Sequence, residues 1–235
     1  MKYITLPDDR IRRLSFYLAM EEYMARTMCE DDAFFMWQVR PTVIFGRNQV
    51  LQNEVNMDYC REHNIEIYRR KSGGGCVYAD MSNVMFSFVS KGGNVNLAFN
   101  RFVNMVVLVL RKMGIEAVGT THNDVMIGDR KVSGTACYLV AGNSIVHSTM
   151  LYDTDMEHML HAITPSTEKL QKKGIESVRQ RITLLKDHTT MSLDAFKTFV
   201  RDSLCQGERM LTPADVAAIE QLEQTYTDVE FIKLH

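Results

Sequence analysis

The residues best suited to chemistry lie in one short segment, where three cationic side chains directly precede three consecutive glycines. Arg69, Arg70 and Lys71 come before Ser72, and the glycines occupy positions 73–75. Glycine tolerates positive φ angles and lets a ligand approach the backbone amides closely. Cationic side chains beside such amides suit a phosphate or a carboxylate. A glycine-rich hairpin turn between exposed arginines would use the same residues, so this segment alone leaves both interpretations open.

A second polar segment predicts a β-hairpin with charged groups on one face. Gly128-Asp129 is a two-residue sequence typical of a hairpin turn. This turn predicts the cross-strand pairs Met126–Lys131 and Asp124–Ser133, with all four side chains on one face. Asp124 and Lys131 would then be diagonal neighbours roughly 7–8 Å apart, close enough to touch one ligand.

Two further segments carry polar groups. Residues 147–151, His-Ser-Thr-Met-Leu, are typical of a strand with polar side chains at one end. Residues 173–182 form a basic run that follows Lys169. A solvated basic surface would have the same composition, and His147 could equally be a hydrogen-bonded core histidine.

Taken together and in this order, the four segments resemble the lipoate–protein ligase A family. The resemblance rests on Arg-Arg-x-Ser-Gly-Gly-Gly-x-Val from position 69, Asn-Asp-Val from 123 with Gly-Asp-Arg-Lys-Val-Ser-Gly from 128, His-x-Thr-x-Leu from 147, and Lys-Gly-Ile-x-Ser-Val-Arg-x-Arg from 173. It covers roughly residues 10–185.

The resemblance implies a role for each matching residue. Lys131 would be the catalytic residue, a point charge able to bridge a phosphate and an acyl oxygen. Binding of ATP and the adenylate is implied for Arg70, Gly75, Cys76, Val77, Tyr78, Asn123, Asp124 and Lys131. Binding of lipoate is implied for Arg47, Ser72, Gly73, Gly74, Lys131, Ser133, Gly134 and His147. Asp124 could also act through Mg²⁺.

The implied reaction uses ATP, Mg²⁺ and (R)-lipoate or octanoate. The acid is first converted to an acyl-adenylate, and a lysine of a lipoyl-carrier domain then displaces AMP. The expected carriers are the acyltransferase subunits of 2-oxoacid dehydrogenases and the H protein of glycine cleavage. Larger family members carry an additional small C-terminal domain. This chain is expected to lack it, so a separate polypeptide could supply it.

Two alternatives use the same fold. An ATP-independent octanoyl or lipoyl transferase would need a nucleophilic cysteine just before the Asn-Asp hairpin, and residues 116–122 contain none. Cys76 and Cys137 are small thiols with apolar neighbours and are interpreted as structural. The other alternative binds lipoyl-AMP or a carrier and needs a partner for adenylation. Lys131 favours the ligase, since a binding protein need not retain it.

Composition and charge limit the class of protein and the kinds of partner that we expect. With 46% hydrophobic and 24% charged residues, the chain has the make-up of a globular protein. Its formal net charge of −2 argues against nucleic acid or an anionic membrane as the main partner. No run of about 18 apolar residues and no signal-peptide pattern occur. The 5 cysteines form no CxxC pair, so we expect a cytoplasmic protein without a disulfide framework.

The order of expected elements predicts an α+β fold with a mostly antiparallel sheet flanked by helices. Apolar residues at helical spacing predict a helix over 11–28, and another over 96–113 that ends at Gly114. The resemblance implies the catalytic-domain fold of biotin and lipoate ligases. We expect one domain over 1–235, with helices within 191–226 closing its C-terminal end.

Overall fold

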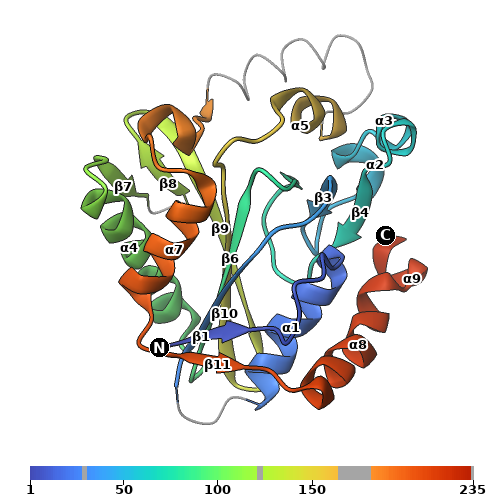
Figure 1. The fold of residues 1–235 in the computed structure, drawn as a ribbon. Coiled ribbons are helices and arrows are strands. Elements are labelled where there is room, and N and C mark those ends of the chain that lie inside the picture. The colour runs from blue at the N-terminus through green and yellow to red at the C-terminus, as the bar shows by residue number, and fades with distance from the viewer. Residues whose placement is uncertain (28–30, 121–123, 164–180, 234–235) are drawn as a thin grey trace.

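A large and a small β-sheet form the centre of the molecule, with helices packed around them (Figure 1). The computed structural model describes residues 1–27, 31–120, 124–163 and 181–233. The large sheet has the strand order β11 (Glu208–Met210), β1 (Lys2–Thr5), β2 (Ala33–Trp37), β6 (Val84–Ser90), β10 (Asn143–Met150), β9 (Arg130–Val140), β8 (Asp124–Ile127), β7 (Ala117–Gly119). The small sheet has the order β4 (Glu66–Arg69), β3 (Thr42–Phe45), β5 (Val77–Ala79).

Most strand pairs are antiparallel. Strand β1 pairs in parallel with both β2 and β11, and β3 pairs in parallel with β4. The other pairings between the named strands are antiparallel. The predicted α+β fold with a mostly antiparallel sheet is therefore confirmed.

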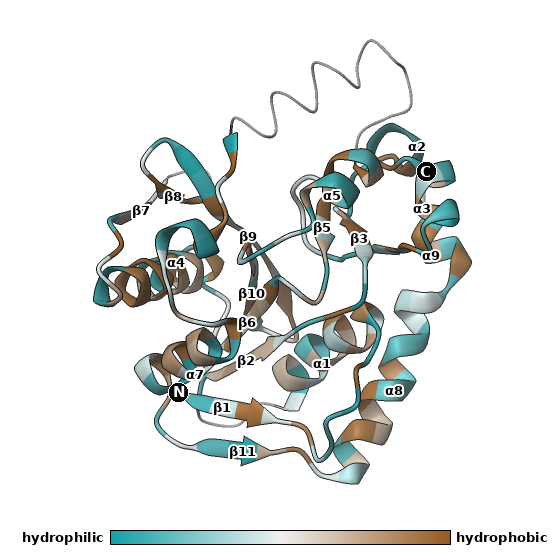
Figure 2. Cartoon of the chain, turned by 45° about the horizontal axis from the view of Figure 1, so that its top comes forward, coloured by the Kyte–Doolittle hydropathy of each residue, from teal (hydrophilic) through white to brown (hydrophobic). Residues whose placement is uncertain are grey.

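The helices fall on both sides of the large sheet. Their bounds are α1 (Leu14–Thr27), α2 (Leu51–Glu54), α3 (Met57–Glu62), α4 (Val95–Lys112), α5 (Met156–Ala162), α7 (Leu193–Leu204), α8 (Pro213–Thr227) and α9 (Val229–Lys233), with a 3₁₀ turn η1 (Leu185–His188). Helices α4 and α7 show alternating hydrophobic and hydrophilic bands in Figure 2, as expected for helices that cover a sheet. Within the described residues, no helix has the length and apolar character needed to cross a membrane.

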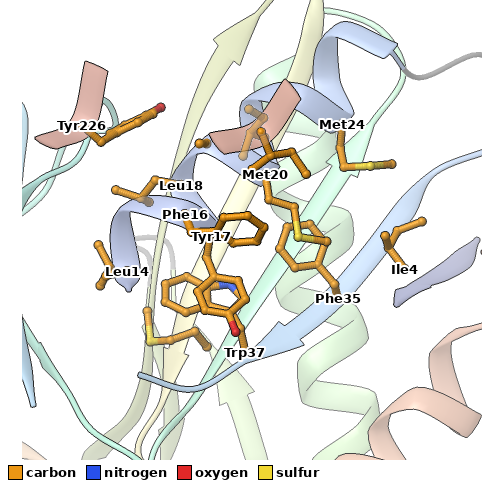
Figure 3. Close-up of a cluster of buried hydrophobic side chains, with 14 of the residues drawn as sticks. Ile4, Leu14, Phe16, Tyr17, Leu18, Met20, Met24, Phe35, Trp37 and Tyr226 are labelled. Carbon is orange, nitrogen blue, oxygen red and sulfur yellow. The ribbon is translucent and has the colours of Figure 1, made fainter. Parts of the chain in front are cut away.

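Two hydrophobic cores lie on opposite faces of the large sheet. One is formed with α1 and α8, and Figure 3 shows Tyr17 of α1 against Trp37 of β2. Their rings are stacked with centroids 4.8 Å apart. The other core is formed with α4 and α7. Because side chains alternate along a strand, Ser87 and His147 share the α1 face with Met85 and Ile145.

The C-terminal helices lie on opposite faces of the large sheet, where α8 covers α1 from outside and α7 packs with α4. The expected helices within 191–226 are observed as α7 and α8, with the short strand β11 between them. Tyr226 of α8 is fully buried next to α1 (Figure 3). Helix α8 begins with a capping box between Thr212 and Asp215, with Pro213 at its first position.

Candidate active site

The three-glycine segment forms a loop between β4 and β5, and we call residues 72–76 the glycine loop. It packs against the turn that follows β3. The amide of Arg47 donates to the Ser72 carbonyl at 2.9 Å. A Cβ atom at Gly46 would lie only 2.0 Å from the Gly74 carbonyl oxygen. Gly46 is therefore needed because no side chain fits between the two loops.

Arg70 holds the glycine loop from inside. Its guanidinium, in a residue only 5% exposed, donates to the carbonyls of Gly73 and Gly75, each at 2.7 Å. It also donates to Ser72 Oγ at 3.1 Å and to the Ile44 carbonyl at 3.1 Å. Burial lowers the Arg70 pKa to about 10, so the side chain stays cationic at neutral pH. Its donors are directed mainly at the protein's own backbone.

These hydrogen bonds from Arg70 use the carbonyl groups of the glycine loop and leave its backbone amides available. A trans peptide places N–H opposite C=O, so the amides of Gly74 and Cys76 are directed away from the guanidinium. Gly74 has φ of 90°. Within the described part of the chain, no hydrogen bond engages the N–H groups of Gly74, Gly75 or Cys76. Successive unpaired amides of this kind form an anion-binding concavity.

The other two cations of the segment point away from the loop. Arg69, 1% exposed, donates to the carbonyls of Arg47 at 2.7 Å and Gln49 at 2.9 Å. Lys71 Nζ pairs with Glu22 at 2.6 Å. The expectation that all three side chains add positive charge to an anion cradle is therefore wrong for these two, because each is engaged by its own neighbours.

The hairpin brings two oppositely charged side chains, Lys131 and Asp124, to the cavity that the glycine loop also lines. Strands β8 and β9 turn at Gly128-Asp129, as predicted, and Met126 pairs with Lys131. Lys131 Nζ lies 2.7 Å from Asp124 Oδ1, and their side chains are 37% and 29% exposed. The predicted register is wrong beyond this point. A β-bulge shifts it, so Asp124 pairs with Gly134 rather than with Ser133.

The bulge decides which side chains face the cavity. Asp124 and Gly134 lie on the Lys131 side, while Ser133 pairs with Val125 on the opposite, fully buried face. A Cβ atom at Gly134 would lie 2.7 Å from both Cε and Nζ of Lys131. The missing side chain of Gly134 is what allows the Lys131 ammonium to occupy its position.

A cavity of about 300 Å³ lies between the glycine loop, the hairpin and α1. Its apolar lining comes from Leu18, Trp37, Ile44, Val77 and Met85. Its other lining residues are Arg70, Gly74, Gly75, Cys76, Asp124, Lys131, Gly134, Thr135, Ala136, His147, Ser148 and Thr149. One cavity therefore offers both an apolar surface and groups that bind negative charge, within the size range of small-molecule sites.

The structure gathers most of the sequence-predicted residues at this cavity. Those that line it are Arg70, Gly74, Gly75, Cys76, Val77, Asp124, Lys131, Gly134 and His147. Asn123 and the basic run up to residue 180 lie outside the described residues.

Five predicted residues are placed elsewhere. Arg47 is exposed on the neighbouring turn, and Gly73 turns its carbonyl towards Arg70. Tyr78 is buried in the core beneath β3 and β5. Ser72 is enclosed beneath its own loop, and Ser133 lies behind the sheet. Direct contact of these five residues with a ligand remains a prediction.

Sequence reasoning missed Glu21. This carboxylate on α1 is fully buried, and its Oε2 lies 2.9 Å from His147 Nδ1. The signal was present: Glu21 follows Leu18 by three residues on the apolar face of the helix, where a charge is rare without a partner. What the sequence did not show is the partner, which lies on β10.

Cys76 has the opposite character to a catalytic thiol. Burial raises its pKa to about 12, so the thiol is neutral at physiological pH. Burial also raises the pKa of Cys137. At Cys76 the effect of burial outweighs the attraction of the nearby Arg70 charge, so neither thiol has the lowered pKa of a reactive thiolate.

The fold defines the chain as a catalytic domain of the lipoate-ligase type. It superposes on the bipartite lipoate protein ligase of Thermoplasma acidophilum, whose structure belongs to an archaeal lipoylation system, with a TM-score of 0.89. That alignment covers 99% of this chain and 96% of the archaeal one, at 26% sequence identity.

Sequence comparison gives the family. The signature of the lipoyl protein ligase A/B catalytic domain matches residues 14–205, and the chain belongs to this family. Lipoate–protein ligase 1 of Staphylococcus aureus is 33% identical over 230 residues, covering 94% of this chain and 70% of the relative. The Bacillus subtilis lipoate-protein ligase LplJ is 35% identical over 167 residues, covering 70% of this chain and 50% of the relative.

Proposed function

We propose that the protein uses ATP to activate lipoate, or a similar medium-chain acid such as octanoate, and transfers the acyl group to a lysine of a lipoyl-carrier domain. The observation that carries the proposal is the shared cavity, where an apolar lining meets the Lys131 ammonium and the unpaired amides of the glycine loop. The apolar part suits the acyl chain. The charged part suits the carboxylate and the phosphates.

The chemistry follows from where the charge is placed. A carboxylate oxygen of the acid attacks the α-phosphate of ATP, which releases pyrophosphate and forms a mixed anhydride. The amine of the carrier lysine then attacks the acyl carbon, and AMP leaves. Lys131 and the loop amides are fixed donors for the negative charge that develops in both steps, and such a donor typically contributes a few kcal/mol.

Asp124 is the residue suited to Mg²⁺. Among the described residues, no group of three or more histidine, cysteine or acidic side chains is arranged to hold a metal ion. Mg²⁺ is, however, commonly bound by one or two carboxylates together with substrate phosphates. A single carboxylate beside the cavity fits that mode, and the ion would supply charge neutralisation of the phosphates.

The acceptors we propose are lipoyl domains of 2-oxoacid dehydrogenase acyltransferase subunits and the glycine cleavage H protein. The relatives named above are lipoate ligases, and the archaeal structure comes from a study of a bipartite ligase with its E2 lipoyl domain. A separate polypeptide could likewise assist this chain, with the site described here forming the adenylate.

The test is a transfer assay with an apo lipoyl domain, lipoate and ATP·Mg²⁺, in which the carrier is weighed by mass spectrometry. We expect the mass to rise by one lipoyl group only when all components are present. Modification from an octanoyl-carrier donor without nucleotide would instead establish the transferase. Pyrophosphate release without carrier modification would show that transfer needs a partner polypeptide.

A further inference from the structure

A buried chain of hydrogen bonds joins α1 to the glycine loop. Glu21 Oε2 lies 2.9 Å from His147 Nδ1, and His147 Nε2 lies 2.7 Å from Ser72 Oγ. Ser72 Oγ accepts from Arg70 Nε at 3.1 Å. Each of the four residues is less than one-tenth exposed. The four residues are therefore largely shielded from bulk water, and two of them, Arg70 and His147, also line the cavity.

The two ends of this chain fix the direction of the bonds that they make. Arg70 can only donate. Glu21 is surrounded by donors, since Ser87 Oγ donates to it at 2.5 Å and His147 also faces it. His147 therefore donates from Nδ1 to Glu21, and its Nε2 bonds to Ser72 Oγ. Ser72 Oγ accepts from Arg70 Nε on its other side.

At its far end the chain reaches the groups that shape the anion cradle. The same guanidinium that donates to Ser72 also grips the carbonyls of Gly73 and Gly75. The bond from Nε sets the rotation of the planar guanidinium, and this rotation sets where the two Nη2 donors point. The amides of the glycine loop are consequently oriented by a carboxylate on another element.

We propose that Glu21 is a positioning residue for nucleotide binding: through the chain just described it holds the glycine loop in the shape that binds the phosphates of ATP. Glu21 is fully buried and does not line the cavity, so it acts without touching a ligand. The inference rests on the proposed function, because it assigns the phosphates to the glycine loop.

Glu21→Gln tests this inference with little change of volume. A glutamine accepts with one atom and donates with the other, so one donor that now faces the carboxylate would meet an N–H. We expect the Kd for a non-hydrolysable ATP analogue to rise about tenfold, while the Kd for lipoate changes less than about twofold. Both constants are measured by calorimetry on the separate ligands, with thermal unfolding as a check on folding.

Ser72→Ala cuts the same chain next to the loop and should give a similar loss of nucleotide affinity. Because both substitutions break one chain, we expect the double variant to be no worse than either single variant. The matched control is Ser87→Ala. Ser87 is a fully buried serine that also contacts Glu21 but leads to Trp37 instead of the loop, and its loss should leave nucleotide affinity near wild type.

The outcomes separate this proposal from the proposed function. Additive losses, or a loss confined to lipoate affinity, would overturn the positioning role. Unchanged nucleotide affinity in Glu21→Gln would do the same. A wild-type protein that binds no nucleotide at all would instead remove the ligase function together with this inference.

Discussion

Two segments beside the cavity share the pattern cation–x–Ser–Gly, yet they fold into opposite arrangements. In one, residues 70–73, the cation is 5% exposed and donates hydrogen bonds to carbonyl groups of its own loop. In the other, residues 131–134, the side chain of the cation is 37% exposed and contacts a single carboxylate, Asp124. The first cation builds the site, and the second is available to a ligand.

The serine and the glycine of each pattern explain the difference. Ser72 accepts from the arginine two residues before it, whereas the bulge turns Ser133 to the other face of the sheet, where its hydroxyl has no partner among the described residues. Gly73 contributes a carbonyl to the arginine, while Gly134 contributes empty space to the lysine. The local backbone, more than the residue types, decides what each cation does.

The largest effect is expected from removing the available cation. Lys131→Ala should lower the rate of adenylation by about 10²–10³, by analogy with the loss of one oxyanion donor. The fold should persist, because Thr183 bonds to the Lys131 backbone carbonyl at 2.9 Å and that bond remains. Pyrophosphate release with lipoate and ATP·Mg²⁺ measures the rate, and circular dichroism confirms folding.

Arg130→Ala is the matched control for this prediction. Arg130 is exposed next to the hairpin turn, and successive residues of a strand face opposite sides. Its loss should change the rate little, within about 0.5 kcal/mol. Equal losses in both variants would mean that general positive charge matters and not Lys131 itself. Full activity of Lys131→Ala would remove the catalytic assignment.

The next-largest effect on the rate is expected from filling the space that Gly134 leaves beside the Lys131 side chain. In Gly134→Ala the new Cβ must displace the end of the Lys131 side chain, from which it would otherwise lie 2.7 Å. A flexible lysine can move, so stability should change little, but a misplaced catalytic group can cost about 10²-fold in rate. We expect slower adenylation with an unchanged melting temperature, read from the same pyrophosphate assay.

Gly73→Ala is the corresponding change in the other segment. Nothing lies within 4 Å of a Cβ built at Gly73, and the carbonyl that Arg70 grips would remain. Its effect on the rate should therefore be much smaller than that of Gly134→Ala. If the two alanines proved equally harmful, the distinction between a glycine that contributes a carbonyl and one that contributes space would be lost.

The sequence predicted the elements of this site better than their contacts. The helix expected over 11–28 is observed as α1 at Leu14–Thr27, and the turn at Gly128-Asp129 is correct, because both depend on local patterns. The bulge was missed because no glycine or proline marks Val132, and one extra residue reverses the face of all that follow.

The roles of Arg70 and Glu21 could not be predicted for another reason. Their partners come from distant parts of the chain: the Ile44 carbonyl lies 26 residues before Arg70, and His147 lies 126 residues after Glu21. A basic residue beside glycines has the same local sequence whether it binds a ligand or the loop itself. Only the folded arrangement of the strands shows which groups accept hydrogen bonds from such a residue.

Replacing each cation by the other type should have a smaller effect, and the two variants should differ in their free energy of unfolding. In Arg70→Lys, one ammonium replaces a planar fork and cannot reach Ser72 and all three carbonyls, so we expect the unfolding free energy to fall by about 1–3 kcal/mol. Lys131→Arg should leave that free energy nearly unchanged, because the side chain is partly exposed. Urea unfolding of both variants checks this, and equal losses would contradict the division between structural and available cations.

The smallest effect on activity is expected at Cys76, the last residue of the glycine loop. If the loop binds through its backbone, Cys76→Ala keeps the amide and should retain adenylation within about twofold.

Burial raises the thiol pKa of Cys76 to about 12, above its value in an unfolded chain, so the native state keeps a proton that the unfolded state releases. The stability that this proton contributes is complete below the unfolded pKa and is lost as the pH rises towards 12. The unfolding free energy of Cys76→Ala should therefore decline less steeply than that of wild type between about pH 9 and pH 11. An acyl adduct on Cys76 in the intact mass, or a parallel decline in both proteins, would show that this thiol takes part in chemistry or is not held neutral by the fold.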